Sequence, residues 1–157
     1  MHPPPAAFSV RPAGADDDAA LADLREQWRR ESHGVAPGSD LTFTPRFRAW
    51  FRSQLAAGSL AWVAEDAQII GMLVMFVHER MPEPARPPTS WGYIGNVFVH
   101  PSRRRAGAGA ALLSAAIEEA RRLDLARLIL NPSPRSVPLY RRAGFSGDHN
   151  LVTLELQ

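Results

Sequence analysis

The 157-residue sequence contains neither cysteine nor lysine, and it has no long apolar run. The absence of cysteine excludes a disulfide framework, a thiolate nucleophile and a thiolate metal site, and we assign no metal ligands. The absence of lysine excludes the Gly-Lys-Ser/Thr signature of a P-loop. No segment approaches the ~20 apolar residues of a membrane span, and the amino terminus is rich in proline rather than in the apolar residues of a signal peptide. We therefore expect a soluble, cytoplasmic protein with no membrane partner.

An excess of charge of one sign is also lacking, because 18 basic residues stand against 16 acidic ones and the formal net charge is +2. Every basic residue is an arginine, and the high pKa of arginine explains an isoelectric point near 9.9. The arginines are spread along the chain instead of forming one basic segment. A surface that binds nucleic acid therefore has little support.

The apolar periodicity predicts one domain in which strands and helices alternate. Residues 1–7 are expected to be a flexible segment, and residues 8–157 form the domain. A strand, a long helix and another strand between residues 91 and 131 make a βαβ unit, which predicts parallel neighbouring strands. In chain order, the predicted strands are residues 8–11, 60–64, 69–78, 91–99, 126–131 and 151–156, and the predicted helices are residues 15–30, 45–57, 107–123 and 137–143.

The most informative segment joins the apolar strand that ends at Val99 to the long helix that begins near Gly107. It contains three consecutive arginines, Arg103 to Arg105, and a second glycine at Gly109. Glycines leave backbone amides uncovered where a helix begins, and those unsatisfied donors lie at the positive end of the helix dipole. The segment therefore predicts a phosphate-binding loop, and we expect a diphosphate as its ligand.

The spacing of the glycines excludes a dinucleotide-binding loop. That loop needs a third glycine at G-x-G-x-x-G and an acidic residue ~20 positions later. Here the third position is Leu112, and the next apolar run closes at Asn131 without a carboxylate. What remains is Arg104-x-x-Gly107-x-Gly109, which resembles the Gln/Arg-x-x-Gly-x-Gly/Ala pyrophosphate loop of the GNAT superfamily of N-acetyltransferases.

A second motif lies on the last predicted helix. Leu139 and Tyr140 are followed, after three residues, by Gly144 and Phe145. This pattern resembles the fourth-helix signature of the same superfamily, a Leu-Tyr or Phe-Tyr pair before Gly-Phe. The predicted strands and helices also follow the family's order along the whole chain, so the sequence is identified as a member of the GNAT superfamily by resemblance.

The resemblance implies a single α/β domain of the GNAT type, with helices on both faces of a mixed central sheet of about six or seven strands. It also implies a splayed pair of parallel strands, whose exposed backbone groups bind the pantetheine arm of acetyl-CoA (coenzyme A) like an added strand. Arg103 and Arg105 have an alternative interpretation as surface charges. The implied cofactor-binding residues are Val97, Phe98, Val99, Arg104, Arg105, Ala106, Gly107, Ala108, Gly109, Ala110 and Asn131.

Acetyl transfer needs a neutral amine and a proton for the departing thiolate. Tyr140 matches the family position whose hydroxyl supplies that proton, and a ring that only packs at the end of a short helix is the alternative. Many relatives carry a glutamate base on the phosphate-loop strand, but residues 93–97 contain no carboxylate. We name no base, because loss of the proton to water also serves, and His100 is expected to border the phosphate loop. The remaining side-chain candidates for a base are Glu31, His33, His78 and Glu79.

Residues 33–40 and 81–90 are expected to flank the acceptor groove, because loops carry specificity on such scaffolds. The carboxylates of Glu31, Asp40, Glu79 and Glu83 slightly favour a cationic acceptor, such as a polyamine, an amino acid derivative or an aminoglycoside-like compound.

The sequence thus predicts an acetyl-CoA-dependent N-acetyltransferase that acts, by direct attack, on a primary amine of a small molecule or peptide. One alternative is a non-catalytic CoA-binding module or sensor. Another is an enzyme that acetylates the amine of a charged tRNA, which needs a continuous basic face. A homodimer is compatible with the resemblance, but no segment locates an interface.

Overall fold

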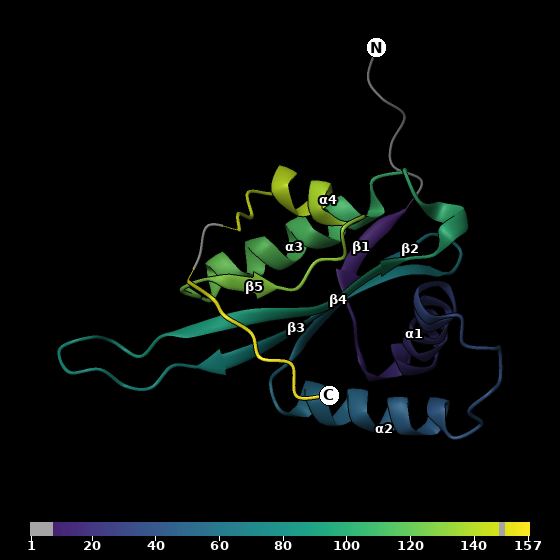
Figure 1. Ribbon diagram of the computed structural model, residues 1–157, viewed down its shortest axis with the longest axis horizontal. Coiled ribbons are helices and arrows are strands. Elements are labelled where there is room, and N and C mark those ends of the chain that lie inside the picture. Colours follow the sequence, from purple (N-terminus) through teal and green to yellow (C-terminus); the bar gives the residue numbers. More distant parts are fainter. Residues whose placement is uncertain (1–7, 148–149) are drawn as a thin grey trace, which may run out of the picture.

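Five strands form one mixed sheet in the order β1-β2-β3-β4-β5 (Figure 1), in a computed structural model that describes residues 8–147 and 150–157. Neighbours from β1 to β4 run antiparallel, whereas β4 and β5 run parallel. The predicted parallel neighbours are therefore confirmed. The strands are β1 (Ser9–Pro12), β2 (Leu60–Glu65), β3 (Ile69–Glu79), β4 (Ser90–Val99) and β5 (Leu128–Leu130).

Helices cover both faces of the sheet, as predicted (Figure 1). One face carries α1 and α2, and the other carries α3 and α4. The helices are α1 (Asp18–His33), α2 (Phe43–Ala56), α3 (Ala108–Arg122) and α4 (Val137–Arg142), with short 3-10 helices η1 (Ala15–Asp17) and η2 (Pro101–Arg103). No helix in the described part of the chain is both long and apolar enough to cross a membrane.

Strand alternation divides the core into two layers. In β3, Leu73 and Met75 point to the α3 side, where they meet Leu112 of α3. Met72 points to the opposite side, where Phe51 of α2 is only 1% exposed. Successive side chains of a strand face opposite ways, so a continuous apolar run such as β3 serves both layers at once.

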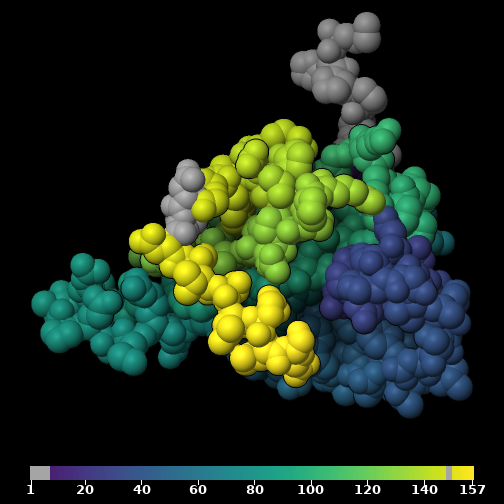
Figure 2. All heavy atoms as spheres, in the orientation of Figure 1, coloured from purple at the N-terminus to yellow at the C-terminus, as the bar shows by residue number. Residues whose placement is uncertain are grey.

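The predicted strand at residues 151–156 is wrong. Residues 150–157 form no strand and lie on the surface (yellow in Figure 2), where Val152 and Leu154 are 94% and 81% exposed. Alternating apolar residues indicate a strand only when a neighbouring backbone completes the hydrogen-bond ladder. The described residues place no such partner beside this segment, so the sheet has five strands rather than the six or seven that we expected.

A β-bulge at Gly95 interrupts the pairing of β3 with β4. Val74 pairs with Asn96 and Met75 pairs with Ile94, which leaves Gly95 without a partner. A bulge shifts the alternation by one residue. As a result, Ile94 and Val97 both pack on the α3 side, while Tyr93 and Asn96 both face α1 and α2.

The pairing of β4 with β5 ends beside this bulge. It runs from Gly92 opposite Leu128 to Ile94 opposite Leu130. Residues 95–99 of β4 continue with no β5 partner in the described part of the chain. The splay of the two strands stays a prediction.

Candidate active site

The turn from β4 into α3 carries a row of backbone amides without acceptors. Arg105 and Gly107 both adopt left-handed backbone, with φ of 65° and 89°. The first amide to bond back into the helix is that of Ala111, which donates to the carbonyl oxygen of Gly107 at 3.0 Å. Within residues 8–147 and 150–157, the amides of residues 105–110 donate to no protein acceptor. This row at the positive end of a helix fits a diphosphate such as that of coenzyme A.

The two glycines of this loop are needed for different reasons. A Cβ atom at Gly107 would meet no atom within 4 Å, so backbone conformation rather than space calls for glycine there. A Cβ atom at Gly109 would lie 3.6 Å from Cδ2 of Leu139, an ordinary contact. Packing within the protein therefore tolerates a methyl group at Gly109, and the bare backbone leaves room for a ligand.

The three arginines of the loop have three different environments. Arg103 forms an ion pair with Asp66 at 2.5 Å. The Nε atom of Arg104 donates to the carbonyl oxygen of Val99 at 3.0 Å, which ties the loop to the end of β4. Arg105 is exposed and pairs with no carboxylate of the described residues. Of the three, Arg105 has the guanidinium that is most available to an anion.

Glu31, near the end of α1, binds one arginine of the phosphate loop and one that precedes α4. Its two carboxylate oxygens accept from the terminal nitrogens of Arg104 at 2.5 and 2.6 Å, and one of them also accepts from Arg135 at 3.1 Å. Arg104 foremost, and then Arg135, lower the pKa of Glu31 to about 2. A general base works best when its pKa lies near the working pH, so Glu31 does not suit that role.

The other candidate bases, His33, His78 and Glu79, pack against aromatic rings or lie exposed at the end of a strand. The His33 ring packs against Trp28 with centroids 5.2 Å apart, and the His78 ring packs against Trp91 at 4.6 Å. His78 and its neighbour Glu79 are exposed at the end of β3. None of these candidates lines the cavity that lies between the α1–α2 layer and the sheet.

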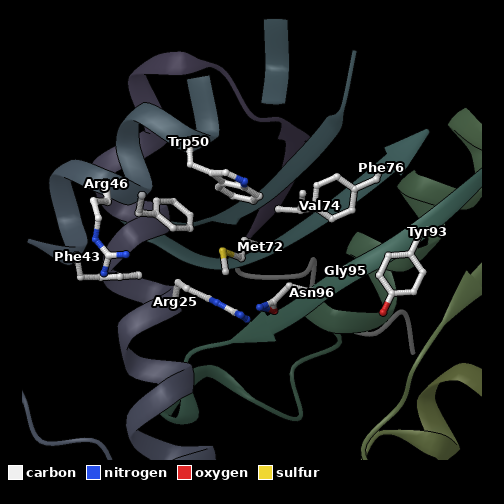
Figure 3. Close-up of a pocket in the computed structure, with 11 residues that line it drawn as sticks. Arg25, Phe43, Arg46, Trp50, Met72, Val74, Phe76, Tyr93, Gly95 and Asn96 are labelled. Carbon is white, nitrogen blue, oxygen red and sulfur yellow. The ribbon is translucent and has the colours of Figure 1, made fainter. Parts of the chain in front are cut away.

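A cavity of about 480 Å³ lies between the α1–α2 layer and the sheet (Figure 3). We call it the aromatic cavity, because five of its eleven lining residues carry aromatic rings. It touches β4 at Tyr93, which still pairs with Ile129 of β5, and at Gly95 and Asn96, which follow the last paired residue of β4. Its volume suits a small-molecule ligand. The lining residues are Arg25, Phe43, Arg46, Phe47, Trp50, Met72, Val74, Phe76, Tyr93, Gly95 and Asn96.

This lining differs from the expected acceptor groove. Residues 33–40 and 81–90 contribute no side chain to it. Besides Glu31, two of the carboxylates that favoured a cationic acceptor are instead paired with arginines: Asp40 with Arg46 at 2.6 Å, and Glu83 with Arg86 at 3.4 Å. The fourth, Glu79, is exposed and does not line the cavity. The charged groups that line the cavity are both arginines. Asp40 neutralises Arg46, so the positive charge of the cavity is that of Arg25.

Two polar groups of the aromatic cavity lack partners. Arg25 stacks over Trp28, with its guanidinium carbon 3.9 Å from the ring centroid, and forms no ion pair with any described carboxylate. Burial, and then the nearby Arg29, lower its pKa. The Oδ1 atom of Asn96 is buried without a hydrogen-bond partner in the described structure.

Tyr140 lies on the other face of the sheet, in the α3-side core. It is 8% exposed, and its ring meets that of Phe145 edge-on at 5.8 Å. Burial raises the pKa of its hydroxyl. Tyr140 borders a second cavity of about 920 Å³ along β5. The packing that we considered as an alternative is therefore present, and it leaves the hydroxyl protonated at neutral pH.

The remaining predicted cofactor residues surround the open half of β4. Val97 and Val99 face the α3-side core, while Phe98 is 5% exposed in the α1–α2 layer. Asn131 is exposed directly after Leu130, the last paired residue of β5. His100 accepts from the amide of Ser102 and so borders the phosphate loop, as expected.

The fold formed by these elements agrees with comparisons to known proteins. The sequence profile of the Acetyltransferase (GNAT) family matches residues 19–145. The chain belongs to this family. GNAT acetyltransferases take their acetyl group from acetyl-CoA, and the resemblance seen in the two sequence motifs is confirmed.

Individual relatives are distant. A glucosamine 6-phosphate N-acetyltransferase from Trypanosoma brucei brucei is 32% identical over 89 residues, which make up 57% of this chain and only 58% of that relative. A GCN5-related N-acetyltransferase from Ralstonia eutropha JMP134 is 30% identical, with a TM-score of 0.71 over 94% of this chain and 98% of that one. A predicted acetyltransferase from Clostridium acetobutylicum, solved with acetyl-CoA, shares the fold at a TM-score of 0.77 and 24% identity, with 95% and 96% of the two chains covered.

Sequence reasoning about this GNAT chain missed the aromatic cavity. Phe47 of α2 belongs to the core and also lines the cavity, so an apolar residue on a helix did not by itself indicate a binding site. Arg25 gave no signal, because arginine beside an apolar stripe usually reaches solvent. The one available signal was Gly95 inside a strand, which is typical of a bulge or a close approach of backbone.

Proposed function

We propose that this chain is an acetyl-CoA-dependent N-acetyltransferase that transfers the acetyl group to a primary amine held in the aromatic cavity. The observation that carries the proposal is the position of residues 95–99 of β4. Among the described residues they have no β5 partner, they begin beside the aromatic cavity and they lead into the free amides of residues 105–110. Residues 96–99 pair with β3 on one side, and their open β5 side thus leads from a small-molecule cavity toward an anion-binding loop.

In this proposal, the loop holds the diphosphate of the donor. The free amides of residues 105–110 donate to it, whereas the amide of Arg104 donates to the carbonyl oxygen of Pro101 at 3.5 Å. Arg105 adds a charge that no described carboxylate neutralises. The backbone of Val97, Phe98 and Val99, together with Asn131, receives the pantetheine arm. Unpaired strand groups accept an extended ligand in the same way that they accept another strand.

Bound acetyl-CoA supplies the acetyl group as a thioester. In the direct mechanism, the amine nitrogen forms a bond to the acetyl carbon, the carbon–sulfur bond breaks and the amine loses a proton to solvent. The amides of the open part of β4 stabilise the oxyanion that develops. Tyr140 donates its hydroxyl proton to the departing thiolate, and the resulting tyrosinate takes a proton back from solvent, so that one proton is lost by the amine and one is gained by the thiol in each turnover. The raised pKa of Tyr140 keeps its proton in place until it is needed.

A CoA-binding module without turnover is the second candidate. It is favoured by the lining of the aromatic cavity, which includes no carboxylate and no imidazole that could act as a base. Retention of a buried tyrosine at position 140 favours the enzyme.

Calorimetry of acetyl-CoA binding to the Gly107→Ala variant tests the loop. Gly58 is the matched control, because its φ of 93° is close to that of Gly107 and its Cβ would also meet nothing within 4 Å. Both substitutions strain the backbone by a similar amount, on the order of 1 kcal/mol. We expect only Gly107→Ala to weaken acetyl-CoA binding.

Release of free thiol from acetyl-CoA, followed with a panel of amines, tests the transfer itself. Amine-dependent release establishes the enzyme. Tight binding of acetyl-CoA with no release on any amine would favour the CoA-binding module. No binding of acetyl-CoA to the unaltered chain would overturn both candidates.

A further inference from the structure

We propose that the acceptor is an aromatic amine that also carries a carboxylate, as in an aromatic α-amino acid, and that Arg25 binds this carboxylate. The inference rests on the proposed function and names the substrate class of the same site. It follows from three features of the aromatic cavity: an arginine that has no counter-ion among the described residues, a wall that contains five rings, and a buried amide oxygen that accepts from no donor of the described residues.

Arg25 is the charged group that needs a partner. Other arginines near the cavity are neutralised, since Arg46 pairs with Asp40, and Arg48 and Arg52 share Asp18. Arg25 has no carboxylate of the described residues within ion-pair distance. Burying part of a guanidinium without an anion is costly, and stacking on the neighbouring indole offsets only some of that cost. A carboxylate of the ligand would complete the pair with two parallel hydrogen bonds.

The direction of the Arg25 side chain supports a role in binding the ligand. Figure 3 shows Arg25 reaching from α1 beneath Met72 toward Asn96 on β4. Its guanidinium therefore lies at the β4 end of the cavity rather than at the rim. A carboxylate bound there lies close to β4, the strand along which the acetyl donor is proposed to bind.

The aromatic wall of the cavity indicates which apolar group the ligand carries. Phe43, Phe47 and Trp50 of α2 form one side, and Phe76 and Tyr93 of the sheet form the other. Their rings contact one another, with Phe47 and Trp50 at 5.5 Å, Trp50 and Phe76 at 6.2 Å, and Phe76 and Tyr93 at 6.5 Å. Such a wall favours an aromatic group, which packs edge-on or offset against other rings.

Asn96 gives a place for the amine. Its Oδ1 atom is buried and accepts no hydrogen bond from the described residues. An N–H of the acceptor would satisfy this oxygen, and the same contact would hold the nitrogen at the point where β4 loses its β5 partner. In an α-amino acid, the amine and the carboxylate are attached to one carbon, so Asn96 and Arg25 can bind them together.

The lining disfavours two other classes of acceptor. A polyamine would meet two arginines and no carboxylate. A sugar phosphate, such as the substrate in the name of the trypanosomal relative, has an anion for Arg25 but would place several hydroxyl groups against rings that offer them few hydrogen-bond partners.

Steady-state thiol release with four amines and two variants tests this assignment. The amines are phenylalanine, phenethylamine, glucosamine 6-phosphate and spermidine. We expect the highest kcat/KM with phenylalanine, about 10- to 100-fold above phenethylamine, which lacks only the carboxylate. Arg25→Gln should remove most of this difference by lowering kcat/KM for phenylalanine and leaving that for phenethylamine within about threefold. Arg29→Gln is the control, since it removes the same charge one turn along α1 from an exposed position outside the cavity.

A second measurement distinguishes the loss of ligand binding from the misfolding of a variant. Thermal unfolding with and without phenylalanine should show a ligand-dependent rise in Tm for the unaltered chain and for Arg29→Gln, and none for Arg25→Gln. Acetyl-CoA binding should be equal in all three proteins.

Other outcomes distinguish a wrong acceptor class from a wrong proposal of acetyl transfer. Equal or better turnover of phenethylamine, glucosamine 6-phosphate or spermidine would overturn the acceptor class while leaving acetyl transfer intact. An equal loss for phenylalanine and phenethylamine in Arg25→Gln would overturn the role of Arg25. Absence of thiol release with every amine would overturn the proposed function, and the inference with it.

Discussion

The guanidinium of Arg104 holds both carboxylate oxygens of Glu31, a residue 73 positions earlier in the chain. This contact fastens the end of α1 to the start of the phosphate loop. Because the Nε atom of the same arginine also donates to Val99, one side chain links α1, β4 and the loop. The carboxylate acts as a fixed anion in this arrangement rather than as a proton acceptor.

Replacing Glu31 by glutamine should therefore disturb the donor site and leave the proton chemistry unchanged. We expect the KM for acetyl-CoA to rise about 3- to 10-fold, because the loop loses a charge-assisted bidentate contact. The pH dependence of kcat should keep its shape, since a carboxyl with a pKa of about 2 does not titrate in the working range.

Glu119→Gln is the matched control for that measurement. Glu119 also pairs with an arginine through both oxygens, Arg122 at 2.6 and 2.8 Å, but it lies in the last turns of α3, away from the loop. Loss of the acidic limb of the pH profile in Glu31→Gln alone would show that Glu31 is the base after all.

The same carboxylate predicts how stability depends on pH. A folded-state pKa of about 2, against 4.5 for the free group, means that Glu31 stabilises the fold fully above pH 4.5 and loses this contribution as the pH falls toward 2. Asp17, beside Arg11, also has a lowered pKa and acts in the same direction. The Tm of the unaltered chain should exceed that of Glu31→Gln at pH 7, and the difference should shrink toward zero as the pH is lowered through this window. A constant difference from pH 7 to pH 2 would contradict the assignment.

Tyr140→Phe tests the proposed proton donor without removing the packing of the ring. We expect kcat to fall about 100-fold, with acetyl-CoA affinity and Tm close to those of the unaltered chain, because phenylalanine keeps the edge-on contact with Phe145. Unchanged kcat would leave Tyr140 as a residue of the core only. In the unaltered chain, ionisation of this tyrosine should reduce kcat only above pH 10, since burial raises its pKa from 10.0.

The features that could be predicted from the sequence are those with a local cause. The phosphate loop was found because arginine and glycine at fixed spacing, next to the start of a helix, are sufficient to expose amides. The bounds of β3 and β4 were predicted within one residue, because each is a single apolar run that ends at polar or proline-rich sequence.

The features that escaped prediction depend on residues far apart in the chain. Glu31 could not be matched with Arg104, since nothing local marks which arginine reaches which carboxylate. Arg25 enters the aromatic cavity only because α2 and β4 close around it. The predicted strand at residues 151–156 had the right alternation but no partner, and pairing is a property of the whole sheet.

Gly95 connects the bulge of β4 to the shape of the aromatic cavity, which gives a last prediction. A Cβ atom at this position would lie 2.4 Å from Cε2 of Phe76, so the ring must move. Phe76 is part of the cavity wall, and its displacement should raise the KM for the acceptor about tenfold while leaving acetyl-CoA binding unchanged. Gly147→Ala is the control, because its Cβ would meet nothing within 4 Å and its φ is not in the left-handed region. If Gly95→Ala instead weakened acetyl-CoA binding and acceptor binding equally, the bulge would act on the whole of β4, and the separation of the donor and acceptor sites along this strand would be wrong.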